Sequence, residues 1–204
     1  PGGEIWGWPW SPPVPSSWWR WRWSGWCLRR ESSRESRCLM RRDATTRQLV
    51  LVDGRSGAGK SEWVTQSEEY AGFVVVSLDD LYPGWDGLDA GHIRAYEQVV
   101  LPWSRGERAR VATWDWGQRI FGGVVEIDPE ASVVIEGCGA LSILTARTPT
   151  YRYWIEADIE VRKRRALERD GELFAPYWTR WALQEVRFYS THRSWELADS
   201  VVRT

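Results

Sequence analysis

The chain has 204 residues and a formal net charge of −1, and its apolar runs fall short of the roughly 18 residues of a membrane-spanning helix. The length suits one domain with a tail, and the balanced charge gives no reason to expect nucleic acid or an anionic membrane as a partner. The three cysteines, Cys27, Cys38 and Cys138, lack C-x-x-C spacing, which argues against a disulfide framework or a zinc site and favours a reducing cytoplasm.

Residues 1–39 have a composition of their own, with eight of the 17 tryptophans and five of the 10 prolines of the chain. They show no helical or strand period and lack the apolar core of a signal peptide. Three interpretations stay open: a surface that binds membranes or nucleic acid, a disordered tail, or sequence read upstream of the true start. We favour the last, because the only methionine is Met40, and we expect the functional domain over residues 40–204.

The first predicted strand, Gln48 to Val52, leads into the sequence GRSGAGKS at residues 54–61. These eight residues fit the phosphate-binding pattern G-x-x-x-x-G-K-[ST] at every fixed position, and residues 62–70 are predicted to be helical. Glycines let successive backbone N–H groups point at one anion, and the following helix adds its positive N-terminal end. The sequence therefore predicts a phosphate-binding loop (P-loop) that holds nucleotide phosphates, made of Gly54, Arg55, Ser56, Gly57, Ala58, Gly59, Lys60 and Ser61.

Two side chains of this loop have predicted roles beyond the backbone cradle. Lys60 is expected to reach the β- and γ-phosphates, and the Ser61 hydroxyl is expected to bind Mg²⁺.

The second predicted strand, residues 73–77, is a run of β-branched residues typical of a parallel strand buried on both faces. Asp79 and Asp80 follow it, and ligands bind beyond the carboxyl ends of strands in open α/β sheets. One of them is therefore a candidate general base for a substrate hydroxyl, or a partner of Mg²⁺ through water. The alternative is that aspartate is simply a common turn residue.

Residues 92–101 are predicted to form a helix that ends at Pro102. Residues 110–116 alternate as a strand does, which would carry Asp115 toward a substrate, and residues 124–127 are expected to pair with them across Gly122-Gly123.

Another buried strand is predicted over residues 132–136. Glu136 ends it, at the position from which a carboxylate orients Mg²⁺ or a water.

A strand over residues 153–156 is followed by a predicted helix, residues 159–170, that is rich in arginine. Arg162, Arg165 and Arg169 stand at i, i+3 and i+7 and so share one face. Such a row suits the charge on a γ-phosphoryl group in transfer, whereas the alternative is a solvated helix with Glu160 and Glu168 as ion-pair partners.

The end of the chain is predicted to hold one long helix or two short ones over residues 176–197, then a strand over residues 198–203. Alternating strands and helices predict an α/β fold, with a parallel sheet and helices on both faces.

From about Gln48 to Val202 the chain resembles P-loop small-molecule kinases of the uridine kinase, pantothenate kinase and phosphoribulokinase group. Besides GRSGAGKS, the likeness rests on three stretches and on Glu136-Gly137 after the buried strand. The stretches are LDDLY at residues 78–82, similar to D-x-F-Y; TWDW at 113–116, similar to Y-D-F; and VRKRRALERD at 161–170, similar to R-x-x-R-R-x-x-R-D.

This resemblance implies a three-layer P-loop NTPase sandwich with a five-stranded parallel sheet in the order 2-3-1-4-5 and an arginine-rich lid. It maps the catalytic base to Asp79, a ribose-holding aspartate to Asp115 and the phosphate-gripping arginines to Arg162, Arg165 and Arg169. Asp80, Tyr82 and Arg119 complete the candidate substrate-binding residues. Uridine kinases follow Y-D-F with a histidine and an arginine, whereas Gly117-Gln118-Arg119 stands here, so the acceptor stays open.

The expected function is an ATP- and Mg²⁺-dependent transfer of the γ-phosphate to a hydroxyl of a small molecule, with nucleosides among the candidates. The P-loop with Lys60 holds the phosphates, Ser61 and Glu136 hold Mg²⁺, and Asp79 takes the hydroxyl proton. Two other classes stay open: a nucleotide-dependent regulatory ATPase or switch, and a nucleic-acid-associated ATPase if residues 1–39 are genuine.

Overall fold

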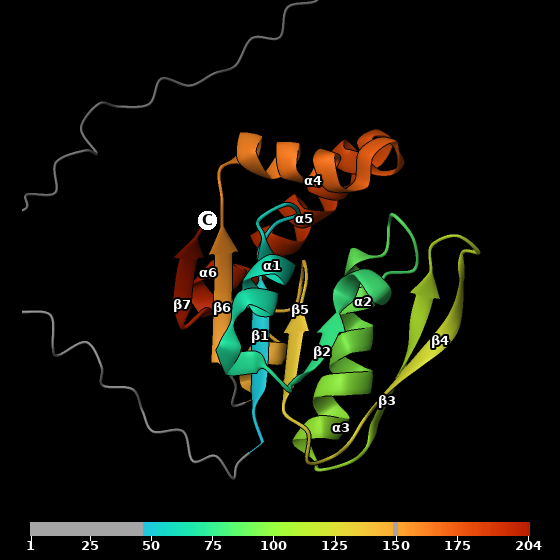
Figure 1. Cartoon of the computed structure of the whole chain (residues 1–204), viewed down its shortest axis with the longest axis vertical. Helices are drawn as coiled ribbons and strands as arrows, with labels where there is room; N and C mark the ends of the chain where they lie inside the picture. The colour runs from blue at the N-terminus through green and yellow to red at the C-terminus, as the bar shows by residue number, and fades with distance from the viewer. Residues whose placement is uncertain (1–46, 149–150) are drawn as a thin grey trace, which may run out of the picture. The chain divides into compact units, whose positions relative to one another are not determined.

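The computed structural model describes residues 47–148 and 151–204 (Figure 1). The expectations for residues 1–39 lie outside these ranges. Within them, every helix is too short or too polar to cross a membrane.

A five-stranded parallel sheet forms the centre of the domain, with its strands in the order β2-β5-β1-β6-β7. The strands are β1 (Leu49–Asp53), β2 (Val74–Ser77), β5 (Val133–Glu136), β6 (Tyr151–Glu156) and β7 (Ser200–Arg203). Counted within this sheet alone, they run 2-3-1-4-5 as expected. The whole-chain labels differ because β3 and β4 form a hairpin outside the sheet.

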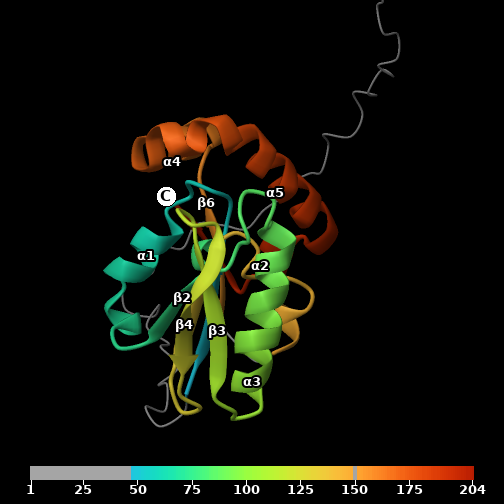
Figure 2. The same ribbon diagram turned by 90° about the vertical axis from the view of Figure 1, so that its right-hand side faces the viewer.

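Helices lie on both faces of the sheet, which makes the three layers (Figures 1 and 2). Helix α1 covers one face, and α2, α3 and α5 cover the other, while α4 passes over the carboxyl ends of the strands. The helices are α1 (Lys60–Gln66), α2 (Leu88–Ala95), α3 (Leu101–Ser104), α4 (Ile159–Phe174), α5 (Trp178–His192) and α6 (Ser194–Leu197). Short 3₁₀ turns lie at Glu68–Tyr70, Leu78–Asp80, Thr145–Arg147 and Ala175–Tyr177.

The strand period divides the core into two clusters. Val50 and Val52 pack with Val64 of α1, whereas Leu49 and Leu51 pack toward the cluster that includes residues of α2 and α5. Strands β1 and β5 are buried along their whole length, as expected for the middle of a parallel sheet.

Strand β2 is an edge strand and departs from the expectation for residues 73–77. Val75 is 50% exposed, so the run is not buried on both faces. The reason is that the face of β2 beside α1 is incompletely covered. The periodicity of a single strand does not reveal how far a helix covers it.

The hairpin consists of β3 (Ala109–Asp115) and β4 (Ile120–Ile127), paired antiparallel with a bulge between Thr113 and Trp114. The expectation of a turn at Gly122-Gly123 was wrong, because both glycines lie inside β4. Gly123 is needed there for a different reason: a Cβ atom on it would lie 2.3 Å from the Thr113 hydroxyl oxygen.

The expected helix end at Pro102 was also wrong. The helical run continues from α2 through a π-turn at Tyr96–Val100 into α3, which ends at Ser104. Pro102 follows directly after this π-turn, so the run passes through the proline without ending there.

Candidate functional site

The P-loop joins β1 to α1 at the carboxyl edge of the sheet, and its glycines are required by geometry. Gly57 and Gly59 have φ of 77° and 89°, in the left-handed region. A Cβ atom on Gly57 would lie 2.1 Å from the carbonyl oxygen of Arg162, so α4 packs directly on the loop. The N–H groups of Gly57 and Gly59 donate to no acceptor among the described residues, which leaves them available to a phosphate.

Three backbone N–H groups of the P-loop are bound within the protein. The N–H of Gly54 donates to Asp53 Oδ1 at 2.6 Å, and the N–H of Ser56 donates to Glu185 Oε1 at 2.6 Å. Ala58 is buried and donates its N–H to the Arg55 carbonyl at 3.1 Å. These three amides serve the shape of the loop, which leaves those of Gly57 and Gly59 open to a phosphate.

Lys60 is buried and lies between the P-loop and the loop after β5. Its Nζ donates to the carbonyl of Arg55 at 3.2 Å and lies 3.7 Å from Cys138 Sγ. Burial lowers the pKa of Lys60, but nearby carboxylates, Glu136 and Asp79 among them, outweigh it, and the net pKa is raised. Lys60 therefore keeps its positive charge, as a phosphate partner requires.

The carboxylate of Glu136 lies against the hydroxyl of Ser61, so the two predicted Mg²⁺ ligands are adjacent. Its Oε1 accepts hydrogen bonds from Ser61 Oγ at 3.1 Å and from Ser77 Oγ at 2.8 Å. Burial raises the pKa of Glu136, and Lys60 offsets part of that rise. One carboxylate and a hydroxyl fit Mg²⁺, which takes few protein oxygens and completes its shell with water and phosphate. Ser77 was missed by sequence reasoning, although it ends the strand just before the acidic loop.

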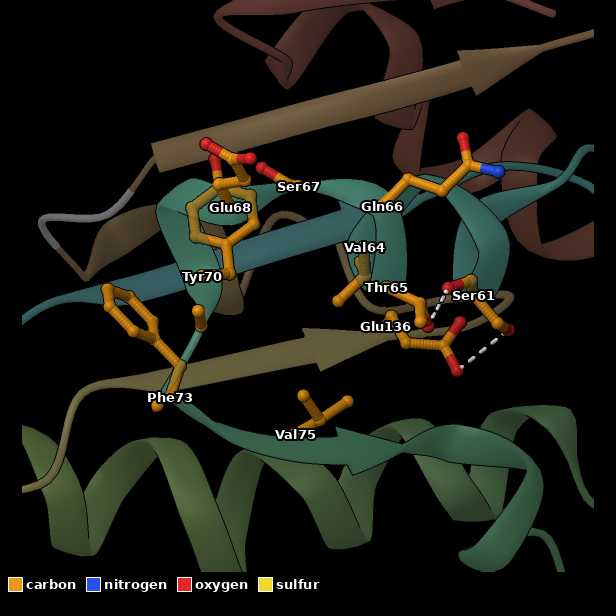
Figure 3. Close-up of a pocket in the computed structure, with 12 residues that line it drawn as sticks. Ser61, Val64, Thr65, Gln66, Ser67, Glu68, Tyr70, Phe73, Val75 and Glu136 are labelled. Carbon is orange, nitrogen blue, oxygen red and sulfur yellow. Dashed lines mark hydrogen bonds between the residues drawn. The ribbon is translucent and has the colours of Figure 1, made fainter.

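A groove of about 540 Å³ opens beside this pair, between α1 and β2 (Figure 3). Ser61 and Glu136 line one end of it, and Tyr70 and Phe73 line the other. The groove follows from the incompletely covered face of β2, where Val75 is half exposed, and no glycine of the P-loop is among its lining residues.

Asp79 and Asp80 lie in the 3₁₀ turn directly after β2, on the same edge as the P-loop. The side chain of Asp79 is 53% exposed, and its Oδ2 lies 3.9 Å from Nη2 of Arg169. Trp116 Nε1 donates to its backbone carbonyl at 2.9 Å, which ties the hairpin tip to this turn. Burial and then the charge of Asp79 raise the pKa of Asp80.

The structure assigns Tyr82 to the core rather than to a substrate site. It is 1% exposed, its ring packs edge-on against Trp181, and its hydroxyl donates to the Cys138 carbonyl at 2.8 Å. The motif fixes the position of this tyrosine in sequence but not the side of the turn on which it lies.

Asp115 and Arg119 form the turn of the hairpin. Asp115 Oδ1 accepts the N–H groups of Gly117 and Gln118, both at 2.8 Å, and Arg119 closes the turn with φ of 57°. One oxygen of the predicted ribose-binding carboxylate is thus occupied in shaping the tip.

The three arginines of α4 have three different environments. Arg162 is buried, and it donates to the carbonyls of Ala157 and Ser56, each at 3.2 Å, so the prediction that it grips a transferring phosphate is replaced by a structural role. Arg165 donates to Thr204 Oγ1 at 2.9 Å and lies next to Gly59 of the P-loop. Arg169 pairs with Asp170 at 2.7 Å and faces Asp79.

Asp53 is a further organising residue that sequence reasoning missed. Its two carboxylate oxygens accept the N–H groups of Gly54, Gly139 and Leu141 and the Tyr189 hydroxyl, at 2.6 to 3.0 Å. Burial raises its pKa to about 6 against the effect of these hydrogen bonds. An acid directly before the first glycine of the P-loop is the signal that was available.

No protein-family model matches the chain, and no curated protein matches it. Among solved structures, a possible uridine kinase from Bacillus stearothermophilus aligns over 77% of this chain and 89% of its own length, with a TM-score of 0.54 and 15% identity. An uncharacterized protein from Eubacterium ventriosum ATCC 27560 aligns over 77% and 88%, with a TM-score of 0.45 and 14% identity. The first likeness confirms the predicted fold, an α/β sandwich with a five-stranded parallel sheet and helices on both faces.

Proposed function

We propose that the protein transfers the γ-phosphate of ATP, with Mg²⁺, to a hydroxyl group of a small molecule. The observation that carries this proposal is the position of the Asp79 carboxylate. It is half exposed beside Arg169 of α4, and it lies two residues after Ser77, whose Oγ donates to Glu136 Oε1 at 2.8 Å. A base, a cation for the phosphates and a metal ligand therefore converge at one edge of the sheet.

In this proposal the protein acts mainly by positioning and electrostatics. The free amides of Gly57 and Gly59 and the ammonium of Lys60 bind the phosphate chain. Ser61 and Glu136 hold Mg²⁺, which neutralises charge on the phosphate oxygens when it is bound. The Asp79 carboxylate accepts the proton of the acceptor hydroxyl as that oxygen attacks phosphorus.

Arg165 and Arg169 are the guanidinium groups left to stabilise the transferring phosphoryl group. Arg165 lies next to Gly59, and Arg169 is 56% exposed, held by Asp170 and near Asp79. Both are on α4, which passes over the phosphate edge (Figure 2). A modest movement of α4 toward bound nucleotide would exchange the carboxylate partners of Arg169 for phosphate oxygens.

The proposed acceptor is a small molecule with a hydroxyl group, and nucleosides are among the candidates. Asp80 lies in the turn after β2 and Asp115 and Arg119 lie at the hairpin tip, so these three stay the proposed acceptor contacts. We also propose the cytoplasm as the site of the reaction, on the cysteine content of the chain.

Release of ADP in the presence of Mg²⁺, ATP and pools of nucleosides, vitamins or sugars tests the proposal. We expect one pool to raise ADP release well above the rate without acceptor, toward the roughly 1–100 s⁻¹ usual for kinases. Slow hydrolysis that no pool accelerates would support a regulatory ATPase or switch instead.

A further inference from the structure

One buried carboxylate, Glu185 of α5, is bound to the P-loop but belongs to none of the roles above. It is 1% exposed, and its Oε1 accepts the Ser56 N–H at 2.6 Å and the Cys138 thiol at 3.4 Å. Its Oε2 lies 3.5 Å from Nη1 of Arg55 and 4.0 Å from Nη1 of Arg162. The carboxylate thus faces the P-loop, the loop after β5 and the start of α4.

Both backbone polar groups of Ser56 are held by side chains. Glu185 takes its N–H, and Arg162 donates to its carbonyl at 3.2 Å. A buried carboxylate is costly unless its partners neutralise it, and here two guanidinium groups do so. The Ser56 carbonyl belongs to the same peptide group as the Gly57 N–H, which has no acceptor among the described residues, so the backbone of Ser56 sets where the amides open to phosphate begin.

The neighbouring residue Gln184 serves a different loop. Its Nε2 donates to the carbonyl of Trp85 at 2.7 Å, and its Oε1 accepts the N–H of Leu88 at 3.4 Å. Adjacent positions on α5 therefore hold the P-loop and the loop after Asp79 separately, which makes Gln184 a matched control for Glu185.

We propose that Glu185 is a positioning residue of the ATP-binding site. It fixes the backbone of Ser56, so that the P-loop amides are preorganised for nucleotide phosphates. This inference rests on the proposed function for its ligand, the phosphates of ATP. Preorganised donors bind an anion without the cost of ordering the loop at the moment of binding. The loss of the carboxylate charge weakens the hydrogen bond to the Ser56 N–H and leaves the two arginines without their counter-charge.

The experiment compares Glu185→Gln and Glu185→Asp with Gln184→Ala, by hydrogen exchange of residues 54–59 and by MgADP affinity. We expect faster exchange in the P-loop and MgADP binding about tenfold weaker or more in Glu185→Gln, since a charge-assisted hydrogen bond becomes a neutral one and both arginines lose their partner. Glu185→Asp keeps the charge one methylene further away, so we expect the same changes in exchange and MgADP affinity to a smaller extent. This variant tests the inference if Glu185→Gln does not fold. Gln184→Ala should leave both readouts as in the wild type.

A kinetic split separates positioning from a general loss of structure. Glu185→Gln should raise KM for ATP with KM for the acceptor unchanged, whereas partial unfolding would lower kcat alone. Wild-type exchange and MgADP affinity in Glu185→Gln would overturn the inference. Normal MgADP binding by a wild type that phosphorylates no acceptor would overturn only the proposed function, and a wild type that does not bind MgADP would overturn both.

Discussion

Lys60 acquires its role from its neighbours as much as from the motif. Burial alone favours a neutral amine, but the nearby carboxylates of Glu136 and Asp79 restore the charge. The result is a cation held inside the loop that wraps the phosphates, where its field is screened little by water.

We expect Lys60→Ala to weaken the transition state more than the ground state. The kcat should fall at least about 100-fold, while MgADP affinity falls about tenfold or less, because charge builds on the γ-phosphoryl group only during transfer. Steady-state kinetics and calorimetric MgADP titration measure the two effects. Lys163→Ala, at an exposed lysine of α4, is the control; equal losses in both readouts of Lys60→Ala would mean that Lys60 only anchors bound phosphate.

At this scale the sequence predicts residues whose chemistry is local and misses those whose role depends on tertiary contacts. The motif located Lys60 and Ser61, and the end of a strand located Glu136. Glu185, in contrast, is 129 positions from Ser56, and an isolated glutamate within a predicted helix has no signal that separates it from a solvated one.

For helix α4 as well, the sequence predicts the local pattern but not the tertiary contacts. The helical period correctly placed three arginines along it, but period does not say what each turn meets. The first turn packs on the P-loop and buries Arg162, so only Arg165 and Arg169 remain near the phosphate side. For the hairpin, glycines suggested the turn, whereas the Asp115 side chain determines it by binding two backbone N–H groups.

The contact between α4 and the P-loop can be tested with two glycines of similar backbone conformation. Gly57→Ala places a Cβ atom 2.1 Å from the Arg162 carbonyl oxygen, while Gly72, at φ of 91°, has nothing within 4 Å of such an atom. Both variants carry left-handed strain of about 1 kcal/mol, but only Gly57→Ala adds the clash, so it should lose at least about 2 kcal/mol more free energy of unfolding. Urea denaturation measures this; equal losses would mean that α4 moves away from the loop at little cost.

For the molecule as a whole, the alternation of strands and helices was enough to predict the fold, because each strand and helix carries its own period. The exposed face of β2 was not predicted, since it depends on which helix covers which strand. The core on the α2 and α5 side also includes a buried histidine, His92, whose Nδ1 lies 2.9 Å from the Gly139 carbonyl oxygen.

His92 predicts how stability depends on pH. Burial lowers its pKa to about 4, against a raising effect of the Gly139 carbonyl, with His192 and Asp89 as its charged neighbours. As pH falls from about 6.5 to 4, the unfolded chain binds a proton that the folded protein does not, so stability decreases, by roughly 3 kcal/mol for this group. In His92→Gln this decrease should be missing from the free energy of unfolding measured between pH 7 and 4. Parallel pH profiles of the two proteins would contradict the prediction.

Following the γ-phosphate itself shows whether Asp79 acts as the base in transfer to a hydroxyl group. ATP labelled at that position is incubated with the wild type, with Asp79→Asn and with the control Asp128→Asn, whose carboxylate is exposed on the hairpin side and pairs with Arg108. We predict label on a small-molecule hydroxyl with the wild type and the control, and transfer at least about 100-fold slower in Asp79→Asn with MgADP affinity unchanged. Full transfer by Asp79→Asn, or label released only as free phosphate by every protein, would contradict the account.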